Sequence, residues 1–130
     1  MRCRFRLALL VFGWPMTAAM AQDRAAEEFF ETTIRPLLVE QCLNCHGEEK
    51  PKGGLKLTSR EAILVGGHGG PAAEPGKAEE SLLLEVVRYD SEPRMPPKGK
   101  LSETEIEALA RWIDLGMPWP GTSESATSGA

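Results

Sequence analysis

The sequence predicts a small, mainly α-helical domain of three to four helices joined by Gly/Pro-rich loops. Apolar residues recur at the 3.6-residue spacing of a helix in separate blocks. One block near the end of the chain carries sequence signals for both helix termini. The 130 residues include 13 glycines and 10 prolines, and many of these fall between the blocks, where they indicate loops.

The first predicted helix follows Asp23, a suitable N-cap, and runs directly into Cys42. Pro36 lacks an amide hydrogen, so we expect it to break or kink this helix. The residues at helical spacing form a face that we assign to the core: Phe29, Phe30, Ile34, Leu37, Leu38 and Gln41.

The middle of the chain predicts two short helices and a loop. A weak helical pattern follows Ser59, and a second short helix covers residues 81–88. Between them, residues 66–71 read Gly-Gly-His-Gly-Gly-Pro, which is typical of a loop. Residues 55–57 are candidates for a brief extended segment.

The last predicted helix begins with a capping box, in which Ser102 is the N-cap and Glu105 follows three residues later. Gly116 suits the position just after the helix, and Pro118 prevents its continuation. Its predicted buried stripe consists of Ile106, Leu109, Ala110, Trp112 and Ile113.

Residues 1–21 have the features of a secretory signal peptide. Three arginines precede an apolar run over residues 7–14, and residues 19–21 form an Ala-x-Ala cleavage site. We therefore expect a domain over residues 22–120, a flexible polar tail over residues 121–130 and a periplasmic or otherwise exported location. The run is shorter than the about 20 residues of a membrane span, so we expect no span after cleavage. An uncleaved anchor is the alternative.

Cys42-Leu43-Asn44-Cys45-His46 reads C-x-x-C-H, the attachment signature of a c-type haem. Two thiols at this spacing can form thioether bonds to the two vinyl groups of one porphyrin, and the adjacent imidazole can bind the iron. The motif therefore predicts one covalent haem c per chain, held by Cys42, Cys45 and His46.

Three alternatives stay open for this motif. A thioredoxin-like dithiol is expected in a βαβ setting, which the pattern of elements does not show. A zinc site needs four ligands, whereas only two Cys and two His remain beyond residue 21. A structural disulfide between Cys42 and Cys45 would suit an exported protein.

Met95 is the best candidate for a second axial ligand of the iron. A thioether is a soft ligand that suits haem iron, and His/Met ligation is typical of electron carriers. The neighbouring Pro93, Pro96 and Pro97 restrict the backbone and would hold the sulfur in place. The alternatives are that Met95 only fills a gap in the packing, or that His68 in the glycine-rich loop is the ligand.

Other residues near the two ends of the last helix are weaker candidates. Arg94, Lys98 and Lys100 are candidates to pair with haem propionates or to mark a docking rim, and a solvated loop is the alternative. Trp112 and Trp119 are candidates to stack near the haem, although we expect core packing for Trp112. We expect Met117 to pack with Trp119.

Several motifs, in one order, resemble the planctomycete-type cytochrome c domain, a relative of class I cytochromes c. The resemblance covers nearly the whole chain beyond residue 21. It implies a cytochrome c-like fold around a covalent haem, with His46 and Met95 as axial ligands. In that family the domain often heads larger proteins, so this chain is either a free-standing carrier or part of a larger protein. The matching stretches are F-E-T-T-I-R-P (30–36), C-L-N-C-H-G (42–47), P-K-G-G-L-K-L (51–57), G-G-H-G-G-P-A (66–72), P-G (75–76) leading into S-L-L (81–83), R-M-P-P-K-G-K-L-S (94–102) and W-I-D-L-G-M-P-W-P (112–120).

The sequence thus predicts a monohaem c-type cytochrome that transfers single electrons between redox protein partners and is not an enzyme. Loss of the three N-terminal arginines would leave 12 basic and 19 acidic side chains, a net charge of −7. This acidic balance argues against nucleic acid or anionic membranes as partners. The alternatives are a haem enzyme or gas sensor with an open sixth site, and a haem-containing interaction module of a larger exported complex.

Overall fold

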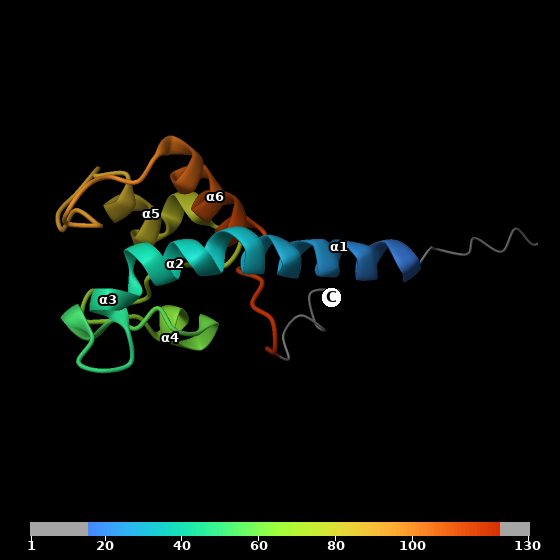
Figure 1. Cartoon of the computed structure of the whole chain (residues 1–130), viewed down its shortest axis with the longest axis horizontal. Helices are drawn as coiled ribbons and strands as arrows, with labels where there is room; N and C mark the ends of the chain where they lie inside the picture. Colours follow the sequence, from blue (N-terminus) through green and yellow to red (C-terminus); the bar gives the residue numbers. More distant parts are fainter. Residues whose placement is uncertain (1–15, 123–130) are drawn as a thin grey trace, which may run out of the picture.

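The computed structural model describes residues 16–122, and within this range it is mainly helical (Figure 1). These residues form no strand, and a single isolated bridge joins Gly67 and Gly70. The predicted mainly α fold class is therefore confirmed. Most of the expected signal peptide and most of the expected polar tail lie outside the described residues.

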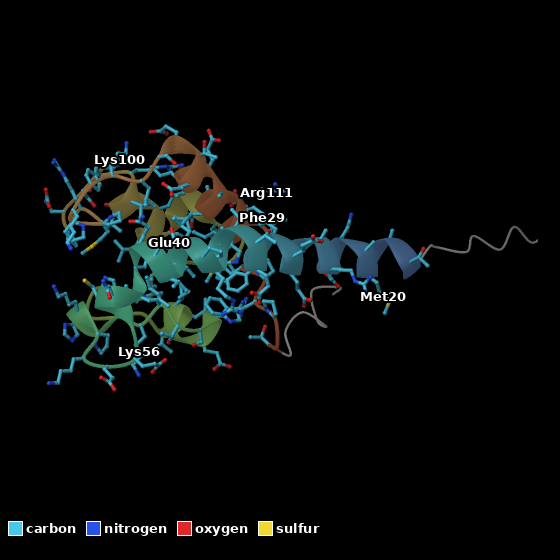
Figure 2. All side chains as sticks on the ribbon, in the orientation of Figure 1. Met20, Phe29, Glu40, Lys56, Lys100 and Arg111 are labelled. Carbon is cyan, nitrogen blue, oxygen red and sulfur yellow. The ribbon has the colours of Figure 1, made fainter. Side chains whose placement is uncertain are left out.

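The longest feature is one helical run formed by α1 (Met16–Phe29), the π-helical turn η1 (Phe30–Ile34) and α2 (Arg35–Gln41). Its N-terminal part projects beyond the other elements (Figure 1), and Met20 on this part is 77% exposed (Figure 2). The prediction of Asp23 as N-cap is wrong, because the preceding Ala-rich sequence consists of good helix formers and continues the helix. Across residues 16–122, no helix is both long and apolar enough to cross a membrane.

Pro36 does not end this helical run, because the π-helical turn η1 precedes it. The amide of Arg35 donates to the carbonyl of Phe30, five residues earlier, and Pro36 then lies in the first turn of α2. The wider turn accommodates the proline ring, which would otherwise clash with a carbonyl oxygen of the preceding turn. Phe30 and Ile34 on η1 are both fully buried.

The predicted short helices are present. Ser59 caps the first of them by accepting the amide hydrogen of Ala62 at 3.1 Å. The expected extended piece over residues 55–57 pairs with no strand, although Leu55 has extended dihedral angles. The elements between α2 and the last helix are α3 (Leu43–His46), η2 (Lys52–Gly54), α4 (Arg60–Val65), η3 (Ala78–Glu80) and α5 (Leu82–Val87).

The last helix, α6 (Glu103–Asp114), begins and ends as its sequence predicts. The Ser102 hydroxyl accepts the amide hydrogen of Glu105, whose carboxylate in turn accepts the Ser102 amide hydrogen. At the other end, Gly116 has a φ of +90°, and the amide of Met117 donates to Trp112 at 3.0 Å. This left-handed turn satisfies the last carbonyls of the helix, as in a Schellman motif.

The core lies where α6 packs across the long helical run. Phe30 of η1 lies between two tryptophans, with ring centroids 5.9 Å from Trp112 and 4.4 Å from Trp119. The indole Nε1–H of Trp112 donates to the carbonyl of Pro118 at 2.9 Å, which satisfies its one polar group. Met117 is fully buried in the same core. Both tryptophans are thus core residues, not residues of the cleft described next.

Candidate functional site

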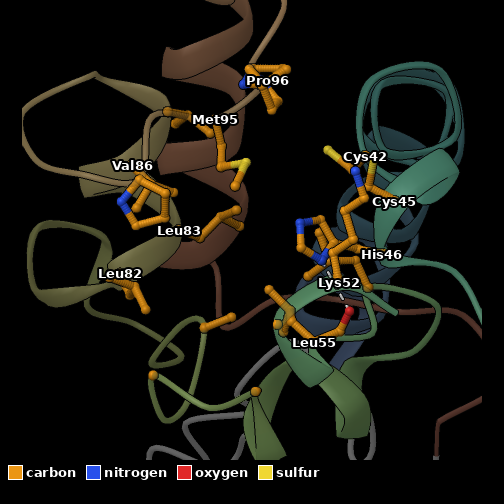
Figure 3. A pocket seen from close by; sticks show the side chains of 18 of the residues that line it. Cys42, Cys45, His46, Lys52, Leu55, Leu82, Leu83, Val86, Met95 and Pro96 are labelled. Carbon is orange, nitrogen blue, oxygen red and sulfur yellow. Dashed lines mark hydrogen bonds between the residues drawn. The ribbon is translucent and has the colours of Figure 1, made fainter. Parts of the chain in front are cut away.

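A cleft of about 290 Å³ separates the C-x-x-C-H segment from α5 and the proline-rich segment that follows it (Figure 3). The lining is mainly apolar, with Leu55 and Leu57 on one side and Leu83, Val86 and Val87 of α5 on the other. Pockets of this kind, apolar with few polar groups, are typical of cofactor sites. All four predicted haem-binding residues, Cys42, Cys45, His46 and Met95, line it.

A single turn of helix places both thiols and the imidazole on one wall of the cleft (Figure 3). The amides of Cys45 and His46 both donate to the carbonyl of Cys42, at 3.2 and 3.0 Å. Both thiols are free in the structure. Burial raises the pKa of the Cys42 thiol to about 11. This direction is opposite to the lowered pKa of a redox-active dithiol, so it disfavours the thioredoxin-like alternative.

The His46 ring is held by the backbone of the chain segment that follows it. Its Nδ1 lies 3.1 Å from the carbonyl oxygen of Leu55. Because that oxygen can only accept, Nδ1 carries the proton, and Nε2 keeps a free lone pair. The amide of Leu57 donates to the His46 carbonyl at 2.9 Å, so the two segments hold each other. An imidazole oriented in this way is prepared to bind a metal ion through Nε2.

Met95 enters the cleft from the wall opposite Cys42, Cys45 and His46 (Figure 3). Its amide donates to the carbonyl of Val86 at 3.0 Å, which ties the segment to α5. The thioether therefore lies across the cleft from the imidazole, where the two side chains could hold the iron of a haem between them. The role of Met95 as a ligand stays a prediction.

His68 also lines the cleft, at its glycine-rich edge, and is exposed. The His68 amide donates to the carbonyl of Gly53 at 2.9 Å, which fixes its loop against η2. Gly66 and Gly70 have φ values of +73° and +93°, and a Cβ on Gly66 would lie 1.8 Å from the Gly70 oxygen. The loop is thus a tight turn that tolerates only glycine at its start.

Two of the basic residues considered for propionate pairing or a docking rim have carboxylate partners of their own. Arg94 pairs with Glu92 at 3.2 Å and Lys100 with Glu103 at 3.6 Å, and neither basic residue lines the cleft. The lysine that does line it is Lys52 of η2, which the sequence reasoning did not single out. Its place in the P-K-G-G-L-K-L stretch, shortly after the haem motif, was the available signal.

These residues fit a covalent haem c better than the alternatives. Two thiols and a free imidazole nitrogen face a thioether across an apolar cleft, which is the donor set that the macrocycle and its iron need. In the part of the chain that the structure describes, no three His, Cys, Asp or Glu side chains form a group that could hold a metal ion. The zinc alternative therefore has no ligand set there.

Comparison with family models supports the family that the motifs indicate. Residues 42–99 match the family model described as Planctomycete cytochrome C, and this range contains Cys42, Cys45, His46 and Met95. Searches of curated proteins and of solved structures gave no match. The resemblance inferred from the sequence is thus confirmed over residues 42–99, whereas the stretches at 30–36 and 112–120 lie outside the match.

Proposed function

We propose that this chain, whose residues 42–99 match the family model of planctomycete cytochrome c, is an exported monohaem cytochrome that carries single electrons between redox proteins. One observation carries the proposal: the free Nε2 of His46 and the thioether of Met95 lie on opposite walls of one apolar cleft. With both His46 and Met95 as ligands, the iron would have no position open for a substrate, which would suit electron transfer.

Each residue has a defined task in this proposal. Cys42 and Cys45 would hold haem c through thioether bonds, and His46 and Met95 would bind its iron. Haem c, when bound, supplies the ferric and ferrous states between which a single electron is exchanged. The Leu55 carbonyl fixes the orientation of the imidazole, and the mainly apolar walls would pack against the macrocycle.

Export is supported by the signal-like N-terminal sequence and by the chemistry of haem attachment, which takes place outside the cytoplasmic membrane. An acidic chain without its leader would pair with redox proteins of complementary charge. Production of the full chain in a host with cytochrome c maturation machinery tests signal cleavage and haem attachment. We expect an intact mass that corresponds to residues 22–130 plus one haem. The full-length mass would instead show an uncleaved anchor.

Carbon monoxide distinguishes the carrier from the enzyme or sensor alternative. We expect a low-spin reduced spectrum that the gas does not change. Met95→Leu keeps the volume of the side chain but removes the sulfur, so the gas should then bind and the reduction potential should fall. Met117→Leu, a buried methionine in the core, is the matched control and should keep the wild-type spectrum. Carbon monoxide binding to the wild type would contradict six-coordination.

A further inference from the structure

The apolar cleft has one polar edge that the axial ligands do not explain. Apart from Gln41 and the predicted haem-binding residues, the polar side chains that line it are those of Lys52 and His68, and none of its lining residues carries a carboxylate. Within residues 16–122, neither the Lys52 ammonium nor the His68 imidazole has a hydrogen-bond or ion-pair partner. Two basic side chains at the cleft therefore have no acceptor among the described residues.

The backbone brings the segments that carry these two side chains together. The amide of His68 donates to Gly53, the residue after Lys52, at 2.9 Å. A Cβ on Gly54 would lie 2.9 Å from His68 Nε2, so the imidazole lies directly against η2. Because η2 leads into Leu55, which holds His46, this edge is continuous with the wall that carries the proximal imidazole.

The other basic residues near the cleft are less suited to an anion inside it. Arg94 and Lys100 each have a carboxylate partner of their own, Glu92 and Glu103. Lys98 is exposed and does not line the cleft. Among the residues that the structure describes, Lys52 and His68 are thus the basic side chains, apart from the predicted ligand His46, that line the cleft.

Haem c carries two propionate carboxylates, and a carboxylate placed against apolar walls is costly unless it is paired. We propose that Lys52 and His68 bind these carboxylates, an inference that rests on the proposed haem-binding function. Charge-assisted hydrogen bonds from an ammonium or an imidazole N–H are the strong kind. They would also set the reduction potential, because compensating the negative carboxylates favours the ferrous state, which has one positive charge fewer.

The test measures reduction potentials of Lys52→Gln, His68→Gln and the double variant by spectroelectrochemistry at low and high salt. Lys98→Gln is the matched control, since it removes an exposed lysine that does not line the cleft. Lys52 is exposed, so solvent and salt screen its charge and the expected effect is small. We therefore expect Lys52→Gln to shift the ferrous/ferric equilibrium about two- to fivefold toward ferric, or about 20–40 mV. The shift should shrink at high salt, and Lys52→Arg should restore the wild-type value.

The outcomes separate this inference from the proposed function. The intact mass and the visible spectrum show first whether each variant carries covalent haem. Absence of haem from the wild-type protein would refute the proposed function itself. Haem-loaded variants whose potentials equal that of Lys98→Gln would overturn the role of Lys52 and His68 and leave the carrier function intact. Spectral bands of the iron ligands should stay unchanged in all variants, because the axial pair is not altered.

Discussion

Gly67→Ala tests whether the glycine-rich loop and η2 approach as closely as the structure shows. A Cβ at this position would lie 2.5 Å from the carbonyl oxygen of Gly53 and 3.0 Å from the backbone nitrogen of Leu55. Gly67 is outside the left-handed region, so alanine costs no backbone strain there. We therefore expect a steric clash between the new methyl group and residues 53–55, the segment that positions His46 through the Leu55 carbonyl.

The magnitude follows from the distances. A carbon and a carbonyl oxygen normally come no closer than about 3.3 Å, so the two segments must separate by roughly 0.8 Å. Overpacking of this kind costs about 1–3 kcal/mol. Replacement of glycine also stiffens the unfolded chain, which stabilises the folded state by about 0.4–1 kcal/mol. Gly99→Ala shares this second effect but has no atom within 4 Å of the new Cβ. The difference between the two variants isolates the clash.

Guanidinium denaturation of the haem-loaded protein, followed by circular dichroism, gives the free energy of unfolding of both variants. We expect Gly67→Ala to be less stable than Gly99→Ala by about 1–3 kcal/mol, with Gly99→Ala equal to or slightly more stable than wild type. Equal stability of the two variants would refute the close approach of the 66–70 loop to η2. The proposed carboxylate-binding edge would then lose its structural basis.

Three further predictions concern the helices and the thiols. Ser102→Ala removes the N-cap of α6 and should lower the free energy of unfolding by about 0.5–2 kcal/mol in urea; an unchanged midpoint would contradict the cap. Glu79 pairs with Arg88 at 2.6 Å and this lowers the pKa of Glu79, so the stabilisation is present above the pKa of the unfolded carboxyl and is lost as the pH falls through the folded value. Glu79→Gln should flatten the acid side of the stability profile, and an identical profile would count against the pair. In haem-free Cys45→Ser protein, alkylation of Cys42 by iodoacetamide should be slow at pH 8 and speed up toward its pKa of about 11, whereas fast reaction at pH 8 would argue against a buried thiol.

Local signals predicted several elements with their boundaries. The capping box at Ser102 and the glycine at position 116 mark both ends of α6, and Ser59 marks the start of α4, because each makes its hydrogen bonds within a few residues of itself. Such contacts depend on nearby sequence alone. The site motif at Cys42, Cys45 and His46 is local for the same reason, since one helical turn brings the three side chains together.

The errors have a common cause. Asp23 resembles an N-cap, but a residue can cap only where the helix actually begins, and the preceding residues extend it. Of the two outcomes expected at Pro36, a break does not occur, because a π-helical turn continues the helical run while Phe30 and Ile34 stay buried in the core. In both cases the outcome depends on neighbours that propensity at a single position does not describe.

The sequence by itself determined the helical class, the caps of the later helices and the residues able to attach a haem. Only the tertiary structure decided what lies across the cleft from His46, because Met95 is 49 residues away and reaches the opposite wall through its attachment to α5. The tertiary structure also places Lys52 and His68 in the lining of the cleft, whereas Arg94 and Lys100 pair with Glu92 and Glu103 outside it. Which side chains line the cleft depends on packing between segments that are distant in the sequence. The spacing of residues along the chain does not determine which of several similar side chains will face the cleft.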